Sequence, residues 1–225
     1  MKPLADAVLI ASKDLRIEFR TGGRLVAMAA FVVLAAFLFS FAFDRALVDG
    51  RSLGAGLVWL TVVFSSTVGV GRTFHMEDED GAFRHLLLTP ASRTSVFLGK
   101  GLANLVLVWI TSALVFGTIV VFFGIRSPGS LLGHAAVLLP GSVGLVALLT
   151  LFSRVSSHSR LGDTLLPVLT FPLLLPLVFF GSTASARLFL GRPWAEVSGP
   201  VRILWAFALV SAVGSALLFS QVAED

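Results

Sequence analysis

The chain has 225 residues, of which 56% are hydrophobic and 13% charged, and its mean hydropathy is +0.93. These values exclude a soluble globular domain and predict one integral membrane domain over residues 1–225, built of helices, because backbone in hydrocarbon must satisfy its own hydrogen bonds. The absence of cysteine excludes disulfides and thiolate metal sites, and we attribute the net charge of +4 to membrane topology and not to nucleic-acid binding.

Residues 1–24 predict an amphipathic helix lying in the membrane interface. Apolar residues recur there at helical spacing, namely Leu4, Val8, Ala11, Leu15 and Phe19. Lys13, Arg16 and Arg20 lie on the other side, where they would face anionic head groups. The Gly22–Gly23 pair is expected to break this helix before the first span. An ordinary basic tail is the alternative.

Six apolar runs predict six transmembrane helices, at about 25–43, 53–71, 102–123, 131–152, 164–181 and 201–222. The fifth contains Pro167, Pro172 and Pro176, and each removes a backbone donor, so this helix is expected to be bent or locally unwound. Residues 181–200 are too polar for a simple span and are expected to form a short re-entrant or surface helical pair.

The predicted spans contain almost no charged residues. Proton- or sodium-coupled carriers bury an acid or a base near the midplane to bind the coupling ion. If this chain takes part in transport, the energy must therefore come from outside it.

Six spans place both termini on one side of the membrane. Segments 1–24, 72–101 and 153–163 together hold eleven Lys and Arg residues, whereas the other polar segments hold six. This excess places both termini and the 72–101 segment in the cytoplasm.

Residues 72–100 form the long polar interruption between the second and third spans. Four consecutive acids precede Gly81: Glu77, Asp78, Glu79 and Asp80. The acids would sit at the positive end of a short helix that starts at Gly81 and ends before Pro90. Phe83, Leu86 and Leu87 give this helix an apolar face. Such a coupling helix fits a groove on a soluble partner, and a solvated loop that spaces two helices fits the pattern equally.

The end of the polar stretch leads into the third span. Ser92 or Thr94 is expected to cap that helix, and Lys100 is expected to reach the head groups. Gly99-Lys100 resembles the end of a phosphate-binding loop, but Thr94 stands where the first glycine is needed and Gly101 replaces the hydroxyl residue. ATP binding by such a loop is therefore excluded.

No catalytic or metal site is predicted. A calcium loop around Gly81 would have Met76 at its first ligand position and Leu87 at its last, so the closing acid is missing. We interpret each of the four histidines as a solvated loop residue at the surface and not as a metal ligand: His75, His85, His134 and His158. An enzyme needs several polar groups at one depth, and none are found.

Several motifs together resemble the CcmB family, the permease subunits of the cytochrome c maturation haem exporter and a branch of the ABC-2-type exporters. They are Lys13-Asp14-Leu15-Arg16 with Glu18 and Arg20; Glu79-Asp80-Gly81 with Leu86-Leu87-Leu88-Thr89-Pro90; Leu98-Gly99-Lys100; and Leu165-Leu166-Pro167 with Phe171-Pro172-Leu173-Leu174-Leu175-Pro176-Leu177. The acidic-glycine motif is specific only to the superfamily. The proline-spaced fifth span, with Ser156-Ser157-His158-Ser159-Arg160 before it, is typical of this family, and Phe83 departs from the leucine expected there.

The resemblance implies a permease of the bacterial inner membrane that dimerises and docks a separate ABC ATPase (CcmA-like) through the coupling helix. It also implies haem-handling membrane subunits (CcmC-like and CcmD-like). ATP then belongs to the partner, no cofactor is bound by this chain alone, and haem is either transported or held by a partner. The four tryptophans are scattered, so this chain is not expected to be the haem-presenting subunit.

Two other functions fit the residues. One is an ABC-2-type permease for another substrate, such as a lipid or a drug. The other is a non-transport scaffold or membrane enzyme, which the missing polar constellation disfavours.

Overall fold

The computed structural model describes residues 3–42, 50–74, 92–124, 128–157 and 162–222. Every regular element in these ranges is an α-helix, which confirms the all-α prediction. The helices are α1 (Pro3–Thr21), α2 (Gly23–Ala42), α3 (Gly50–Val70), α6 (Arg93–Phe123), α7 (Leu131–Ser157), α8 (Gly162–Phe189) and α9 (Trp194–Val222). The predicted coupling helix and its residues from Glu77 to Pro90 lie outside the described ranges.

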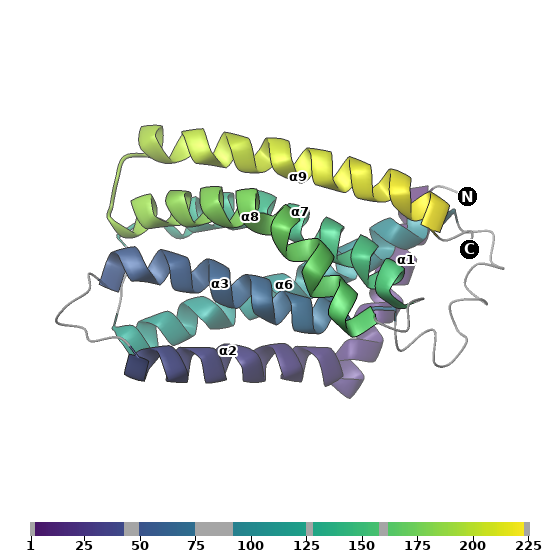
Figure 1. Ribbon diagram of the computed structural model, residues 1–225, viewed down its shortest axis with the longest axis horizontal. Helices are drawn as coiled ribbons and strands as arrows, with labels where there is room; N and C mark the ends of the chain where they lie inside the picture. The colour runs from purple at the N-terminus through teal and green to yellow at the C-terminus, as the bar shows by residue number, and fades with distance from the viewer. Residues whose placement is uncertain (1–2, 43–49, 75–91, 125–127, 158–161, 223–225) are drawn as a thin grey trace.

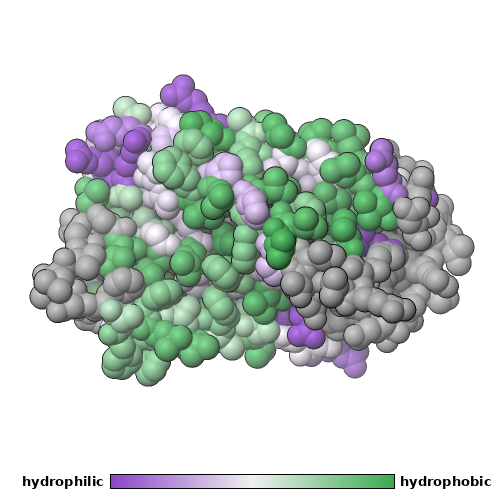
Figure 2. Space-filling view, in the orientation of Figure 1, coloured by the Kyte–Doolittle hydropathy of each residue, from purple (hydrophilic) through white to green (hydrophobic). Residues whose placement is uncertain are grey.

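Six of these helices, α2, α3, α6, α7, α8 and α9, are long and apolar enough to cross a membrane. They lie side by side along the long axis of the molecule (Figure 1). The space-filling view shows apolar side chains over the middle of the surface and hydrophilic ones toward its two ends (Figure 2). The predicted number of spans is confirmed, and the chain is a multi-pass membrane protein.

The helix α1 precedes the spans and packs against the N-terminal part of α6. Gly22 ends α1 with a φ of 70°, a left-handed conformation that glycine adopts without steric cost. Its amide donates to the Glu18 carbonyl at 2.6 Å, and α2 begins at the next residue. The predicted break at Gly22–Gly23 is confirmed.

Two apolar clusters hold the helices together. The larger one lies among the six spans and includes the fully buried Trp59, whose indole Nε1 donates to Ser185 Oγ at 3.0 Å. The smaller one lies where α1, α6, α7 and α9 meet and includes Phe74, Phe97 and Phe219. Phe74 is the last described residue in the first part of the polar stretch 72–100, so this second cluster anchors the start of that stretch.

Residues 181–200 do not form the separate helical pair that their polarity suggested. The helix α8 continues to Phe189, and α9 begins at Trp194 after a short turn. The helix tolerates its polar side chains because Ser182 and Thr183 both donate to the Phe179 carbonyl of the preceding turn.

The helix α8 remains helical through Pro167, Pro172 and Pro176, and its ribbon bends partway along (Figure 1). The bend agrees with the sequence prediction. No separate unwound stretch interrupts the helix.

Candidate functional site

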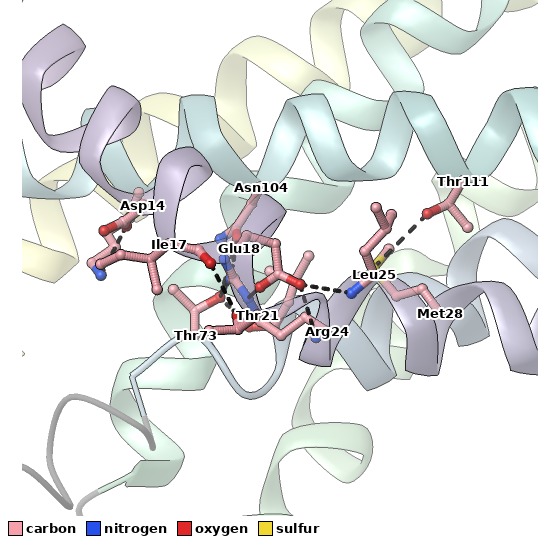
Figure 3. A network of polar contacts seen from close by, with 12 residues as sticks. Asp14, Ile17, Glu18, Thr21, Arg24, Leu25, Met28, Thr73, Asn104 and Thr111 are labelled. Carbon is pink, nitrogen blue, oxygen red and sulfur yellow. Dashed lines mark hydrogen bonds and ion pairs between the residues drawn. The ribbon is translucent and has the colours of Figure 1, made fainter.

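A network of buried polar side chains joins α1, α2 and α6 to Thr73, near the start of the polar stretch (Figure 3). At its centre, Arg24 of α2 pairs with Glu18 of α1, and the Arg24 Nε lies 2.8 Å from Glu18 Oε2. The exposed fractions of these two side chains are 9% and 4%. The Glu18 Oε1 also accepts the backbone amides of Arg24 and Leu25, each at 2.9 Å. Glu18 therefore caps the start of α2 while it neutralises a buried arginine.

The contacts of Glu18 favour its charged carboxylate form over the protonated form. Burial alone would raise the pKa of Glu18, because it disfavours the charged form. The amide of Leu25 and the guanidinium and amide of Arg24 hydrogen-bond to the carboxylate, and the Arg24 charge attracts it. Together these contacts hold the pKa of Glu18 below its ordinary value of 4.5.

Arg24 extends the network across the bundle. Its Nη1 donates to Asn104 Oδ1 of α6 at 3.0 Å and to Thr73 Oγ1 at 3.3 Å. Thr73 Oγ1 lies 2.6 Å from the Val70 carbonyl and 3.2 Å from Asn104 Oδ1, and its one proton serves one of these acceptors at a time. Asn104 Nδ2 then donates to Thr150 of α7 at 3.2 Å. Four elements are thus joined by buried side chains.

A second ion pair fixes α1 on α6. Lys100 Nζ lies 2.9 Å from Asp14 Oδ2, and both side chains are buried. Asp14 Oδ1 also lies 3.1 Å from Nζ of Lys13, which is 48% exposed. The two helices come close because Gly99 has no side chain: a Cβ there would lie 2.7 Å from Ile10 Cβ and 2.8 Å from the Ala7 carbonyl.

Phe74 follows Thr73 and is also fully buried. Its ring centroid lies 5.6 Å from Lys100 Nζ and 5.9 Å from the Arg154 guanidinium carbon, and 5.8 Å from the Phe219 ring centroid. Both cations lie over the Phe74 ring, where the negative face of its quadrupole attracts them. Thr73 and Phe74 thus connect the start of the polar stretch to α1, α2, α6, α7 and α9.

The helix α1 has three faces, whereas the sequence pattern predicted two. An exposed apolar strip contains Leu4, Val8 and Phe19, as predicted. An exposed basic strip contains the predicted Lys13, Arg16 and Arg20. The third face is buried against the bundle and contains Asp6, Ala7, Ile10, Ala11, Asp14 and Glu18. Ala11, assigned to the lipid-facing side by the periodicity, lies on this buried face. The membrane position of α1 stays a prediction.

The expectation for Lys100 is wrong, whereas the buried Arg24, Lys100 and Arg154 lie outside the predicted spans. Lys100 does not reach the head groups, because α6 continues without a break from Arg93 and places it 2% exposed against Asp14. The span-forming helices α2, α6 and α7 also bury Arg24, Lys100 and Arg154 toward the α1 end. Ser92 caps α6, as predicted: its Oγ accepts the Ser95 amide at 3.1 Å.

The other predicted positions do not join this network. His134 lies in α7, 8% exposed, with its ring centroid 5.2 Å from the centroids of Phe116 and Phe189. Its burial corrects the view of His134 as a surface histidine. Pro172 and Pro176 are exposed on α8. No group of three or more potential metal ligands occurs in the described ranges.

Sequence reasoning missed Asp14, Glu18, Arg24 and Thr73 as network members. Arg24 and Asn104 are 80 residues apart, so no local spacing relates them. One signal was available: Asp14 and Glu18 are four residues apart and therefore share one face of α1. The buried salt bridges hold α1 against α2 and α6. Such links between helices suit the transmission of movement from one helix to the next.

Comparison with known proteins identifies the family of the chain. Residues 5–222 match the family model described as CcmB protein. The chain is 29% identical over 207 residues to the heme exporter protein B of Bradyrhizobium diazoefficiens, an alignment that covers 89% of both chains. It is 26% identical over 178 residues to the heme exporter protein B of Rhodobacter capsulatus, covering 79% of this chain and 81% of the relative. The protein of the same name from Paracoccus denitrificans is 28% identical over 178 residues, covering 78% and 80%.

Proposed function

Because the chain belongs to the CcmB family, we propose that it is the membrane-spanning permease subunit of a haem exporter that acts in the maturation of c-type cytochromes. The observation that carries the proposal is the family match, which extends from α1 to the last turn of α9. The chain acts as a transporter subunit and not as an enzyme. Its cargo is haem, or it drives the release of a haem-loaded partner.

The energy for this process comes from an ABC ATPase on a separate chain (CcmA-like). We expect that chain to bind the cytoplasmic segment 77–90. Movement of this segment would first reach Thr73 and Phe74. The contacts of Thr73 with Arg24 and Asn104 support transmission to α2 and α6, because a buried, bonded network moves as a unit more readily than a solvated one.

The remaining partners follow from the same proposal. Haem-handling membrane subunits (CcmC-like and CcmD-like) and a second copy of this chain complete the complex. Large apolar side chains exposed on α2 and α9 support contact with lipid or with other subunits, since a single chain leaves them uncovered. The complex lies in the bacterial inner membrane, with both termini of this chain in the cytoplasm, as the Lys and Arg distribution favours.

The proposal is tested in a strain that lacks the gene. We expect c-type cytochromes, detected by haem staining, to disappear and to return when the wild-type chain is supplied. The tagged wild-type chain should co-purify with an ATPase chain from native membranes. Normal cytochrome levels together with a new sensitivity to a compound would contradict the proposal and favour a permease for another substrate.

Two substitutions separate ATPase docking from transmission. Glu79→Lys reverses a charge in the coupling segment, so we expect it to abolish ATPase co-purification. Thr73→Val removes the buried hydroxyl and should keep the ATPase bound while cytochrome maturation falls. Thr67→Val is the matched control, because within the described residues the Thr67 hydroxyl donates only to the Val63 carbonyl of its own helix. Loss of ATPase binding in Thr73→Val, or equal defects in both threonine variants, would contradict transmission through Thr73.

A further inference from the structure

An apolar groove lies between α6, α7 and α9. It is lined by Phe97, Leu98, Gly101 and Leu105 of α6, Ala147 of α7 and Ala212 of α9, among others. The cavity volume is about 170 Å³. All three helices are membrane spans, and Leu98 is 36% exposed on the outer surface. The groove therefore opens toward lipid.

The lining of the groove suits a hydrocarbon chain, because the residues named above carry apolar side chains or none. Phe97 and Leu105 are separated by ~12 Å along the axis of α6. Gly101 keeps the groove open, since no atom lies within 4 Å of a Cβ built there.

A cation lies about one helical turn before the lining residue Phe97, at the start of α6. Arg93 begins α6, ~12 Å from Gly101 along the helix axis. Its Nη1 donates to the Ser220 carbonyl of α9 at 3.0 Å, which places the guanidinium between two of the helices that line the groove. The exposed Thr94 lies on the same face of α6 as Gly101 and Leu105 by helical spacing. A phosphate here would meet a guanidinium and a hydroxyl at the first turn of a helix.

We propose that this groove binds an anionic phospholipid, with one acyl chain against Gly101 and the phosphate at Arg93 and Thr94. An apolar groove that opens to lipid, with a cation about one helical turn away, matches the two parts of such a molecule. The lipid would lie in the leaflet at the α1 end and would fix α9 against α6 beside the anchor of the polar stretch. The site does not depend on which cargo the permease handles.

Native mass spectrometry of the purified full chain, with its co-purifying subunits, tests the site. We expect the wild type to retain a single phospholipid and to prefer added phosphatidylglycerol over phosphatidylethanolamine. Gly101→Leu fills the groove and should lose this lipid. Gly117→Leu is the matched control, because Gly117 lies on the same helix outside the groove and also has open space at its Cβ. Arg93→Gln should retain lipid binding but lose the preference for the anionic head group.

Two results would overturn the site. The first is a Gly101→Leu variant that folds, as judged by circular dichroism and gel filtration, and retains the lipid. The second is a Gly101→Leu variant that loses a bound polypeptide instead of a lipid, since that result would make the groove a subunit interface. If Gly101→Leu does not fold, Ala212→Leu narrows the same groove from α9, and retention of the lipid in that variant contradicts the proposal as well.

Discussion

At the scale of single residues, the two lysines that contact Asp14 differ in burial. Their ion pairs with Asp14 should therefore contribute differently to the free energy of unfolding. Lys100 is buried in the bundle and Lys13 is 48% exposed. Breaking a buried ion pair by removing one partner costs about 3–5 kcal/mol, because it leaves a charge buried without compensation. An exposed pair contributes about 0–1 kcal/mol.

We therefore expect Lys100→Met to destabilise the protein by about 3 kcal/mol or more, whereas Lys13→Met changes stability by less than about 1 kcal/mol. Reversible unfolding in detergent, followed by circular dichroism, measures both variants under the same conditions. Equal effects of the two substitutions would show that the buried pair does not hold α1 on α6.

At the scale of elements, α1 shows how much a periodic pattern reveals. The exposed apolar and basic strips follow from spacing along one helix, and the sequence predicts both. The buried face was missed because Asp14 and Glu18 are charged, and a charged residue on an isolated helix is expected to face water. Their partners Lys100 and Arg24 lie on α6 and α2, so only the packed structure brings the charges together.

The close contact between α1 and α6 depends on the absence of a side chain at Gly99. We expect Gly99→Ala to destabilise the protein by about 1–3 kcal/mol, because the added methyl overlaps Ile10 and forces the two helices apart. Gly117→Ala is the control on the same helix, where open space surrounds the new methyl and helix propensity should stabilise by up to about 1 kcal/mol. Thermal unfolding in detergent compares the two variants. If Gly99→Ala left the stability unchanged, α1 would be able to shift away from α6 without a cost in free energy.

At the scale of the whole molecule, hydropathy predicted the number of spans but not where the helices end. The helix α6 has 31 residues and is ~46 Å long, about 16 Å longer than a typical hydrocarbon layer of about 30 Å. A hydropathy window identifies only the apolar part of such a helix. The segment from Arg93 to Gly101, which includes Lys100, therefore falls outside the predicted span 102–123, although the predicted cap at Ser92 or Thr94 already places it in the helix.

The six-span arrangement places the start of α1 and the end of α9 at one end of the bundle and the α8–α9 turn at the other (Figure 1). The native chain has no cysteine, so a single introduced cysteine reports its own side of the membrane. We expect Ser12→Cys, on the exposed surface of α1, to react with a membrane-impermeant maleimide only in inverted vesicles. Arg192→Cys, exposed in the α8–α9 turn, should react only in spheroplasts, because the basic segments are retained in the cytoplasm. The reverse pattern would place the coupling segment outside the cell, where no ATPase could reach it, and would contradict both the topology and the proposed source of energy.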